Sequence, residues 1–409
     1  MRILHLSQYF PPEPGAVQVR AHAMAANLVR RGHQVTVLTE IPNHPTGIIH
    51  PEYRGKLLVR EDLDGIDVVR VWVKTAPHKT FSTRMAFYLS YMVNAALRGL
   101  LLAGRYDVVF VNSPPLFVGG AGLALSYLRR TPFVFEVQDL WPESAVEMGE
   151  LNNPRFIRWA TWLEERCYHR ARRIVAVTDG IYNRLRERGY SENKLALIEN
   201  GSNTDLFRPR PKAGAQLRAK WGLQDKFIAL YGGIMGLAQG IETLVETARL
   251  LVDETDVHLI LVGGGPRRQA IEALVELYQL PNLTLLPSQP LQVMPAYLSA
   301  ADVALVPLRD LALFRGARPT KMFDAWACQR PTVVSIAGEA RRVMQEANAG
   351  LAAEPENPAG IARALLALRN DPEKRRQLGL NGQRYVDARY SLQAMAIKLE
   401  QVFRKSIGT

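Results

Sequence analysis

Two carboxylates follow an apolar run in the first half of the chain. Phe133 to Val137 has the composition of a buried strand, and Asp139 and Glu143 come directly after it. Ligands of open α/β sheets bind beyond the carboxyl ends of the strands, so these two side chains could orient a substrate hydroxyl group. The alternative is a helix start, with Asp139 as the cap and Glu143 in the first turn. We favour the functional interpretation because Trp141-Pro142 is an unusual pair for a simple cap.

A glycine-rich loop in the second half offers backbone N–H groups to a phosphate. Gly232, Gly233, Gly236 and Gly240 follow the apolar run Phe227 to Tyr231, and Gln239 lies among them. Exposed N–H groups of this kind cradle phosphate oxygens. The loop lacks the Lys-Ser/Thr ending of a P-loop, so ATP hydrolysis is not indicated. A structural turn is the alternative interpretation.

A basic segment further along has the features of a diphosphate site. Arg315, Arg318 and Lys321 surround a predicted helix start, where Thr320 is a plausible N-cap. A helix N-terminus contributes about 0.3–1 kcal/mol toward an anion, and each charge-assisted hydrogen bond about 1.5–3 kcal/mol. Asp324, one turn inside the helix, could accept hydrogen bonds from ribose hydroxyls. The alternative is a solvated basic loop.

Three further candidates lie near the N-terminus. Glu13 and Gly15 belong to the loop Pro11 to Ala16, and Gly15 allows close approach of a ligand just before a helix. His44, in Pro42 to Gly47, could contact a substrate. A plain tight turn explains the first loop equally well. The chain has no His-x-x-x-His pair and no Asp-x-Asp triplet, so we expect no metal site.

The elements that must position these residues form two α/β series. The first runs strand, helix, strand from Arg2 to Thr39, and continues through apolar runs at 68–73, 108–111, 133–137 and 173–177. The second restarts at Phe227 and continues at 241–252, 257–262, 267–278, 283–286, 303–306 and 332–336. This order predicts two doubly wound parallel sheets with right-handed crossovers. The linker lies near Asn200 to Lys212, and residues 391–406 form a final amphipathic helix.

Composition supports a folded protein with anionic partners. The chain has 409 residues, 47% of them hydrophobic, and a formal net charge of +12 that both halves share. A nucleotide, a lipid diphosphate or a membrane surface fits this charge, whereas the motifs of nucleic-acid binding are missing. We expect Cys167 and Cys328 to be buried, reduced thiols in a cytoplasmic protein without a secretory leader.

The longest apolar stretch, Met85 to Ala103, is interrupted by Ser90, Asn94 and Arg98. It therefore falls short of the ~18–20 apolar residues that a membrane span needs. Lys74, Lys79, Arg84 and Arg105 flank it, so it could rest on a membrane surface. An ordinary buried helix is an equally good interpretation.

An ordered set of motifs resembles the family 4 glycosyltransferases of GT-B fold, and within them the bacterial O-antigen and capsule enzymes that act on amino-sugars. The resemblance covers essentially the whole chain. It rests on Tyr9 to Glu13, Asp139 to Ser144, Asn200-Gly201 with Asp205 to Phe207, Gly236 to Gly240, Ala301 to Val303, Phe314 to Gly316, Pro319 to Lys321 and Phe323-Asp324.

Two departures from the broad family matter. It has a pair of glutamates where this chain has Gly316 and Asp324, and an Arg and a Lys in the glycine loop where this chain has Gly233 and Gln239. The phosphate charge must therefore be met elsewhere, and Arg315 and Lys321 are the candidates. The branch that the chain most resembles makes similar replacements.

The resemblance implies a fold and an activity. The fold is two Rossmann-like domains facing across a cleft, with an acceptor domain at 1–200, a nucleotide-sugar domain at 201–387 and a C-terminal helix at 388–409 that crosses back to the first domain. The activity is metal-independent sugar transfer with retained anomeric configuration, from a donor that is UDP-linked, such as a UDP-N-acetylhexosamine, or GDP-linked. The acceptor is a glycan or a polyprenyl-diphosphate-linked sugar, in surface polysaccharide synthesis.

The resemblance assigns roles to the candidate residues. The donor would contact Gly15, Gly232, Gly233, Gln239, Arg315, Thr320, Lys321 and Asp324, while Glu13, His44, Asp139 and Glu143 would serve the acceptor. Asp139, Arg315 and Lys321 would act in catalysis. The enzyme would work in the cytoplasm or at the inner face of the cytoplasmic membrane. Two other functions fit the same architecture: a nucleotide-sugar epimerase and a non-catalytic nucleotide-sugar-binding protein.

Overall fold

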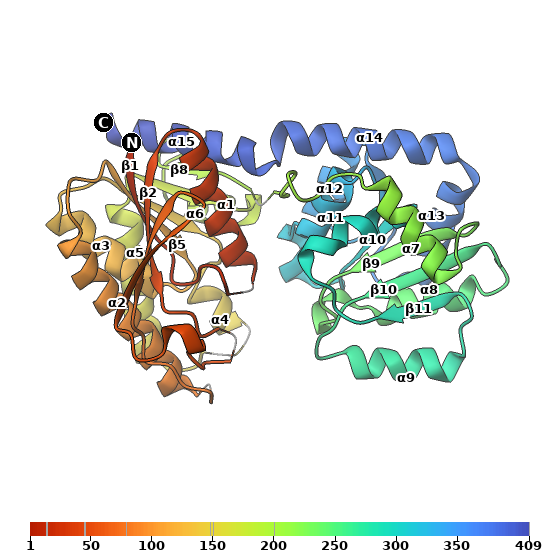
Figure 1. Ribbon diagram of the computed structural model, residues 1–409, viewed down its shortest axis with the longest axis horizontal. Helices are drawn as coiled ribbons and strands as arrows, with labels where there is room; N and C mark the ends of the chain where they lie inside the picture. The colour runs from red at the N-terminus through yellow and green to blue at the C-terminus, as the bar shows by residue number, and fades with distance from the viewer. Residues whose placement is uncertain are drawn as a thin grey trace. The chain divides into compact units, whose positions relative to one another are not determined.

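The computed structural model describes residues 1–408 apart from residues 14, 45, 79, 148, 150 and 200. Lys79 and Asn200, which the sequence analysis named, therefore lie outside the described residues. The chain forms two compact units (Figure 1). Unit 1 comprises Met1–Glu199 and Met395–Thr409, and unit 2 comprises Asn200–Ala394.

Unit 1 is built on an eight-stranded sheet of order β3-β4-β2-β1-β5-β6-β7-β8. All neighbouring strands of this sheet pair in parallel except β3 and β4, which pair antiparallel. The strands are β1 (Arg2–Leu6), β2 (Gln34–Glu40), β3 (Leu58–Leu63), β4 (Ile66–Val71), β5 (Val108–Ser113), β6 (Phe133–Val137), β7 (Arg173–Ala176) and β8 (Leu195–Leu197). The helices are α1 (Ala16–Arg30), α2 (Phe81–Leu101), α3 (Phe117–Leu128), α4 (Glu143–Glu147), α5 (Pro154–Arg170), α6 (Asp179–Glu187) and most of α15 (Leu392–Ile407).

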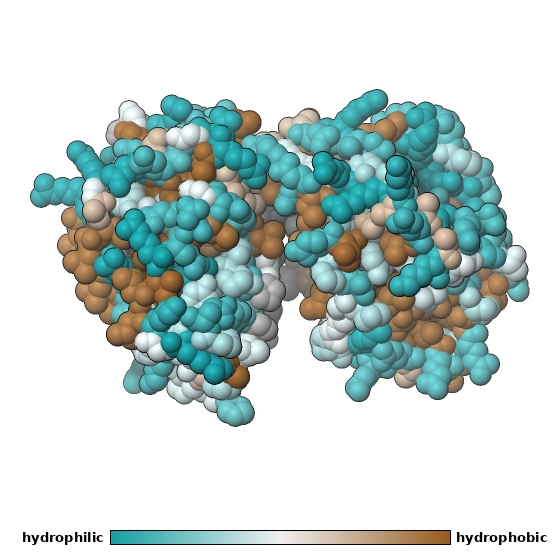
Figure 2. Space-filling model, in the orientation of Figure 1, coloured by the Kyte–Doolittle hydropathy of each residue, from teal (hydrophilic) through white to brown (hydrophobic). Residues whose placement is uncertain are grey.

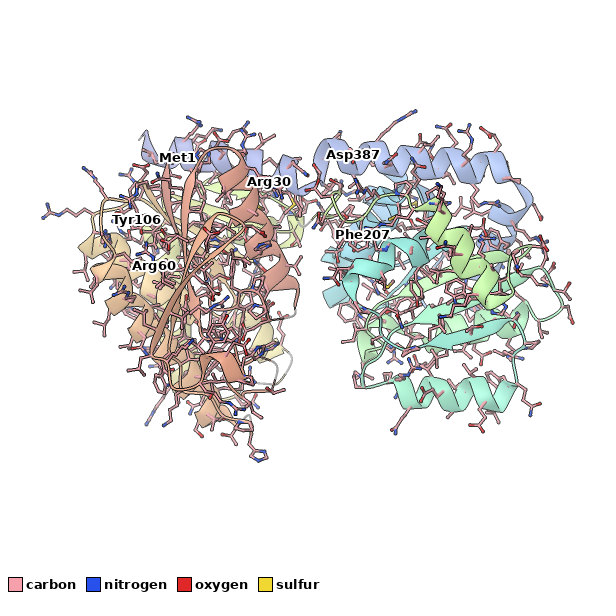
Figure 3. The ribbon with its side chains drawn as sticks, viewed as in Figure 1. Met1, Arg30, Arg60, Tyr106, Phe207 and Asp387 are labelled. Carbon is pink, nitrogen blue, oxygen red and sulfur yellow. The ribbon has the colours of Figure 1, made fainter. Side chains whose placement is uncertain are left out.

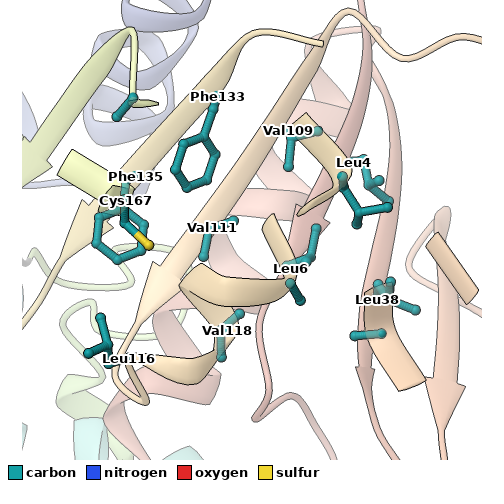
Figure 4. Close-up of a cluster of buried hydrophobic side chains, with 14 of the residues drawn as sticks. Leu4, Leu6, Leu38, Val109, Val111, Leu116, Val118, Phe133, Phe135 and Cys167 are labelled. Atoms are coloured by element: carbon teal, nitrogen blue, oxygen red, sulfur yellow. The ribbon is translucent and has the colours of Figure 1, made fainter. Parts of the chain in front are cut away.

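The core of unit 1 explains why its strands read as continuous apolar runs. Helices pack on the sheet, so β1, β5 and β6 are buried on both sides, as parallel strands usually are. Leu4, Val109, Phe133 and Phe135 meet in one cluster that also holds the free thiol of Cys167 (Figure 4). Cys328 is likewise free and buried, as expected.

Arg129, one residue beyond α3, fixes the end of α2. Its guanidinium group donates to the carbonyls of Gly99, Leu100 and Leu102, at 2.8, 3.1 and 3.0 Å. It also lies over the ring of Tyr106, which Figure 3 labels, 5.3 Å from the ring centroid. These contacts satisfy carbonyls that have no partner within the helix and join α2 to α3.

Unit 2 repeats the design with six parallel strands in the order β11-β10-β9-β12-β13-β14. The strands are β9 (Phe227–Gly232), β10 (Val257–Val262), β11 (Leu283–Leu286), β12 (Val303–Pro307), β13 (Thr332–Ser335) and β14 (Gly350–Ala352). The helices are α7 (Pro211–Trp221), α8 (Glu242–Leu250), α9 (Arg268–Tyr278), α10 (Met294–Ala300), α11 (Thr320–Ala327), α12 (Glu339–Ala347), α13 (Pro358–Asn370) and α14 (Pro372–Arg389). The sheet order reverses between β9 and β12, so ligands are expected at the carboxyl ends of these strands.

The structure confirms the predicted fold class and the elements that were read from apolar runs, within a few residues at their ends. The sequence analysis did not predict the strands β3, β8 and β14, or the helices α3, α5, α6, α7, α10, α12, α13 and α14. In β3, Leu58–Leu63, exposed and half-buried residues alternate and three of the six are charged, so an apolar-run criterion misses this edge strand.

Candidate functional site

Unit 2 holds a pocket of about 450 Å³ beyond the carboxyl ends of its central strands. The pocket lies beside the reversal of sheet order between β9 and β12, where this architecture binds ligands. Its walls combine backbone-rich loops with apolar side chains. The lining comprises Phe207, Leu230, Gly232, Gly233, Ile234, Val262, Gly263, Gly264, Ser288, Gln289, Leu291, Met294, Leu298, Ala304, Leu305, Thr320, Lys321 and Asp324.

Five residues that the sequence analysis assigned to the donor line this pocket: Gly232, Gly233, Thr320, Lys321 and Asp324. They come from segments almost ninety residues apart in the chain. The glycines are there because β9 ends at Gly232, and the other three because α11 starts at Thr320. The structure therefore brings the glycine loop and the basic helix start into one site.

Lys321 is the cation of this pocket. Its Nζ donates to the hydroxyl of Tyr231 at 2.9 Å and lies 4.1 Å from the centroid of the Tyr231 ring. Burial lowers the pKa of Lys321 to about 8, although the Coulomb attraction of Asp324 opposes this shift. The ammonium group is thus held in place and poorly solvated, which strengthens its interaction with an anion.

Asp324 lies one turn after Lys321 on α11. The Ser202 hydroxyl donates to its Oδ1 at 2.7 Å. Burial raises the pKa of Asp324 to about 7, while the Ser202 hydrogen bond and Lys321 act in the opposite direction. The carboxyl group therefore changes its charge near neutral pH, beside a lysine that changes its charge one unit higher.

The absence of a side chain at Gly233 leaves room for Lys321. A Cβ atom on Gly233 would lie 2.8 Å from Lys321 Nζ, and the backbone has φ +148°. The loop after the adjacent strand β10 comes even closer, because a Cβ on Gly263 would overlap the Gly233 carbonyl oxygen. Close packing of the two loops and the lysine thus requires glycine at both positions.

Three donor candidates have other places in the structure. Thr320 is the first residue of α11 rather than its N-cap, so that expectation was wrong: Pro319 holds the extended cap position, and the helix start has no side-chain cap. Gln239 is absent from the pocket lining, and its Oε1 accepts the N–H of Gly236 at 3.1 Å. Arg315 is also absent from the lining; its side chain is 65% exposed and lies 3.9 Å from Asp310.

Glu13 and His44 meet in unit 1. Glu13 Oε1 accepts the backbone N–H groups of Asn43 and His44, both at 2.7 Å. Burial raises the pKa of Glu13 although both hydrogen bonds lower it. His44 lines a second pocket, of about 200 Å³, together with Tyr9, Asn43, Gly47, Ala76, Thr83, Arg84, Phe87 and Tyr88. Gly15 lies directly before α1, as expected.

Asp139 and Glu143 form a separate group in unit 1. Asp139 Oδ2 accepts the Ser144 hydroxyl at 2.9 Å, and burial raises the pKa of this carboxyl. Glu143 pairs with Arg184 at 2.8 Å. Since α4 begins at Glu143, Asp139 does not cap it. Neither residue lines the 200 Å³ pocket, so the structure does not gather the four acceptor candidates into one lining.

The sequence analysis missed several residues that line the pocket or hold its charged groups. Tyr231 was read as the end of a strand, and Ser202 as part of a linker, although both hold charged groups of the site. Ser288 and Gln289 follow β11, as Gly263 and Gly264 follow β10. The strand ends were a usable signal for these two pairs, because the apolar run before each pair is recognisable in the sequence. Among the described residues, no cluster of three or more His, Cys, Asp or Glu side chains is placed to hold a metal ion.

Comparison with known proteins matches each half of the chain to a glycosyltransferase domain. Residues 15–201 match the model of a glycosyl transferase 4-like domain, and residues 226–371 match that of glycosyl transferases group 1. The putative colanic acid biosynthesis glycosyl transferase WcaI of Escherichia coli is 25% identical, over 75% of this chain and 76% of that protein. The D-inositol 3-phosphate glycosyltransferase of Thermomonospora curvata is 27% identical, over 91% and 86%.

Solved structures share the fold. HepE of Anabaena, in complex with UDP-glucose, superimposes with a TM-score of 0.71 at 16% identity, over 99% of each chain. The fold and the two domain models together define a glycosyltransferase of GT-B type. The chain belongs to glycosyltransferase family 4.

Proposed function

We propose that the chain transfers a sugar from a UDP-linked donor bound in the unit 2 pocket, with retention of anomeric configuration. The observation that carries the proposal is the half-buried Lys321 ammonium group, which lines the pocket beside the Gly232-Gly233 backbone. A diphosphate matches this fixed cation, and the two glycines let its oxygens approach the backbone closely. The Gly233 N–H itself donates to the Val262 carbonyl at 2.9 Å, so it is not available to the phosphate as the sequence analysis expected. The UDP-glucose complex of HepE, a protein of the same fold, supports a UDP donor. An N-acetylhexosamine is our candidate sugar, on the resemblance to amino-sugar transferases.

In the proposed reaction, the bond between the sugar C1 and the diphosphate oxygen breaks, and the acceptor oxygen bonds to C1 on the same face. The acceptor's proton passes to the leaving diphosphate oxygen, so no protein nucleophile and no metal ion are needed. Negative charge grows on the diphosphate as the bond breaks, and a fixed ammonium group stabilises this charge without rearranging. Lys321 supplies it, and Asp324 accepts a hydrogen bond from the ribose.

The acceptor in this proposal is a glycan or a polyprenyl-diphosphate-linked sugar of a surface polysaccharide. Unit 1 would recognise it through Asp139 and Glu143, or through Glu13 and His44. A polyprenyl-linked acceptor lies in a membrane, so we further propose that the protein works at the inner face of the cytoplasmic membrane.

The donor part of the proposal is tested by thermal shift of the full chain with UDP, GDP and ADP. A nucleotide at ~100 times its Kd should stabilise the protein by ~2.7 kcal/mol, and we expect UDP to be effective at the lowest concentration. Turnover of UDP-N-acetylhexosamine on a polyprenyl-diphosphate sugar, followed by NMR of the anomeric proton, tests retention; the same assay with EDTA tests metal independence. Stronger stabilisation by GDP, an inverted product or loss of activity in EDTA would each contradict the corresponding part.

The two other functions predict different products from the same assays. An epimerase converts the donor into a new sugar nucleotide without any acceptor. A non-catalytic binding protein is stabilised by UDP but releases none from a UDP-sugar with any acceptor. Transfer to an acceptor with release of UDP excludes both.

The role of Asp139 is tested by Asp139→Asn. The amide keeps an oxygen that can accept the Ser144 hydroxyl, so the melting temperature should stay near that of the parent. We expect kcat to fall while the UDP affinity is unchanged, because the donor pocket lies in unit 2. Ser144→Ala is the control, since it removes this hydrogen bond and leaves the carboxylate. A lower melting temperature with unchanged kcat in Asp139→Asn would show a purely structural role.

A further inference from the structure

The outward side of α2 is apolar from residue 85 to the end of the helix. Between residues 85 and 101, the exposed residues are Leu89, Val93, Leu97, Leu100 and Leu101, and no polar side chain is exposed among them. The side chains of Leu97 and Leu101 are 58% and 73% exposed. A helix on the surface of a globular protein normally turns charged and polar residues to water on this side. The exposed side of α2 therefore has the composition of a buried one.

Two polar residues in this part of α2 face the protein instead. The Ser90 hydroxyl accepts the backbone N–H of Lys74 at 2.8 Å, and the Asn94 amide donates to the Trp72 carbonyl at 2.9 Å. Two of the residues that interrupt the apolar stretch in the sequence thus bind the segment after β4. The third, Arg98, is half-buried, so no fully exposed polar side chain interrupts the apolar surface between residues 85 and 101.

The apolar surface continues onto the end of α3. Tyr127 and Leu128 are 58% and 65% exposed, and Leu100 of α2 lines one shallow hollow with Leu128. Figure 2 shows hydrophobic side chains gathered over the part of unit 1 where Figure 1 draws α2 and α3. We call this the α2–α3 surface; it comprises Leu89, Val93, Leu97, Leu100, Leu101, Tyr127 and Leu128.

The charge around the α2–α3 surface is positive. From residue 71 to residue 135 the chain has one acidic residue, Asp107, against seven Lys and Arg. Arg105 and Arg130 are exposed, and Arg105 lines the same hollow as Leu100 and Leu128. A second copy of the chain would bring like charges together across this surface, whereas anionic headgroups would neutralise them.

We propose that the α2–α3 surface docks on a bilayer that contains anionic lipid. The leucines enter the boundary of the acyl chains, and Arg105 and Arg130 lie at the headgroups. Among the helices described, none is long and apolar enough to cross a bilayer. Thr83, Arg84, Phe87 and Tyr88, at the other end of α2, line the 200 Å³ pocket, so docking would bring this pocket near a lipid-linked substrate. The docking itself does not depend on the proposed sugar transfer.

The test is flotation of the full chain with vesicles of phosphatidylcholine and phosphatidylglycerol, compared with phosphatidylcholine alone. We expect binding to the anionic vesicles and a loss of binding when NaCl rises from about 0.1 to about 0.5 M, because salt screens the arginines. The double variant Leu97→Gln/Leu101→Gln should bind at least about tenfold more weakly, since it removes apolar area that enters the bilayer.

A matched control uses two exposed leucines of unit 2. Leu250 and Leu277 are 50% and 71% exposed, close to Leu97 and Leu101, so Leu250→Gln/Leu277→Gln changes composition equally and should not alter binding. Sugar transfer to a water-soluble acceptor should be the same in both double variants. No binding to anionic vesicles, or equal losses in both double variants, would overturn the proposal. So would a Leu97→Gln/Leu101→Gln variant that changes only the sedimentation coefficient, because the occupant would then be a second copy.

Discussion

Replacing Lys321 by Ala should remove most of the affinity for a nucleoside diphosphate without destabilising the empty protein. The lysine is half-buried and lines the pocket, and desolvation lowers its pKa to about 8, so its charge is disfavoured while the pocket is empty. At pH 7, one unit below that pKa, about 90% of the side chain is still charged. A charge-assisted hydrogen bond to a diphosphate contributes about 1.5–3 kcal/mol, which corresponds to a loss of about 10- to 150-fold in affinity.

Isothermal titration calorimetry with UDP measures this loss directly, and kcat/KM of the transfer reaction should fall further, by about 10²–10³. The affinity of the parent protein should also decline above pH 8, as Lys321 loses its proton. Arg315→Ala is the comparison, because that side chain is exposed and outside the pocket lining. We expect it to change the affinity by less than about threefold, as a solvated surface charge does. If Arg315→Ala loses the affinity and Lys321→Ala keeps it, the diphosphate is bound by Arg315 and our reasoning from burial is refuted.

Three further variants examine the surroundings of Lys321. Tyr231→Phe keeps the ring 4.1 Å from the ammonium group but removes the hydroxyl acceptor. The pKa of Lys321 should therefore fall, and the decline of UDP affinity at alkaline pH should begin at a lower pH. An unshifted pH profile of the affinity would contradict this. Gly233→Ala places a Cβ 2.8 Å from Lys321 Nζ and should lose UDP affinity. Gly222→Ala is the control: its backbone has φ +69° with no atom within 4 Å of the new Cβ, so it should lose only stability, by about 1 kcal/mol. Equal UDP affinity in the two variants would exclude displacement of the lysine. Burial raises the pKa of Asp324 from 3.8 to about 7, so the folded protein holds this proton more tightly than the unfolded chain, and the stability it adds is complete below pH 3.8 and lost as the pH rises to about 7. The melting temperature of the parent relative to Asp324→Asn should therefore fall across this range in differential scanning fluorimetry, and a difference independent of pH would show that Asp324 does not titrate there.

The sequence predicted those parts of the site that local patterns determine. Gly232 and Gly233 follow an apolar run, and Lys321 and Asp324 lie at a helix start, so each loop could be placed at a strand end without knowing its neighbours. The hydrogen bond from Lys321 to Tyr231 joins residues ninety positions apart, and no local pattern reports such a contact. The orientation of Arg315 was equally hidden, because a short 3₁₀ helix, Ala312–Gly316, carries it and leaves its side chain in solvent. Arg315 and Lys321 are close in the sequence, but one side chain lies in solvent and the other lines the pocket.

The two compact units differ in how the chain builds them. Unit 2 is one continuous segment, whereas unit 1 needs Met395–Thr409 as well as Met1–Glu199. The returning segment contributes to the core of unit 1: the Phe403 ring lies 5.3 Å from that of Phe110, and Glu400 pairs with Arg31. During synthesis on the ribosome, unit 1 therefore cannot acquire its last helix until all of unit 2 has been made.

This order has a thermodynamic side. Closing a flexible loop the length of Asn200–Ala394 would cost about 4–5 kcal/mol of chain entropy. If unit 2 folds first, its own folding brings the two ends of this segment together. Ser202 and Ser391 form a parallel bridge, in which the Ser202 N–H donates to the Tyr390 carbonyl at 2.8 Å. The chain therefore enters and leaves unit 2 at neighbouring residues, and the last helix can fold onto unit 1 without closing a long flexible loop.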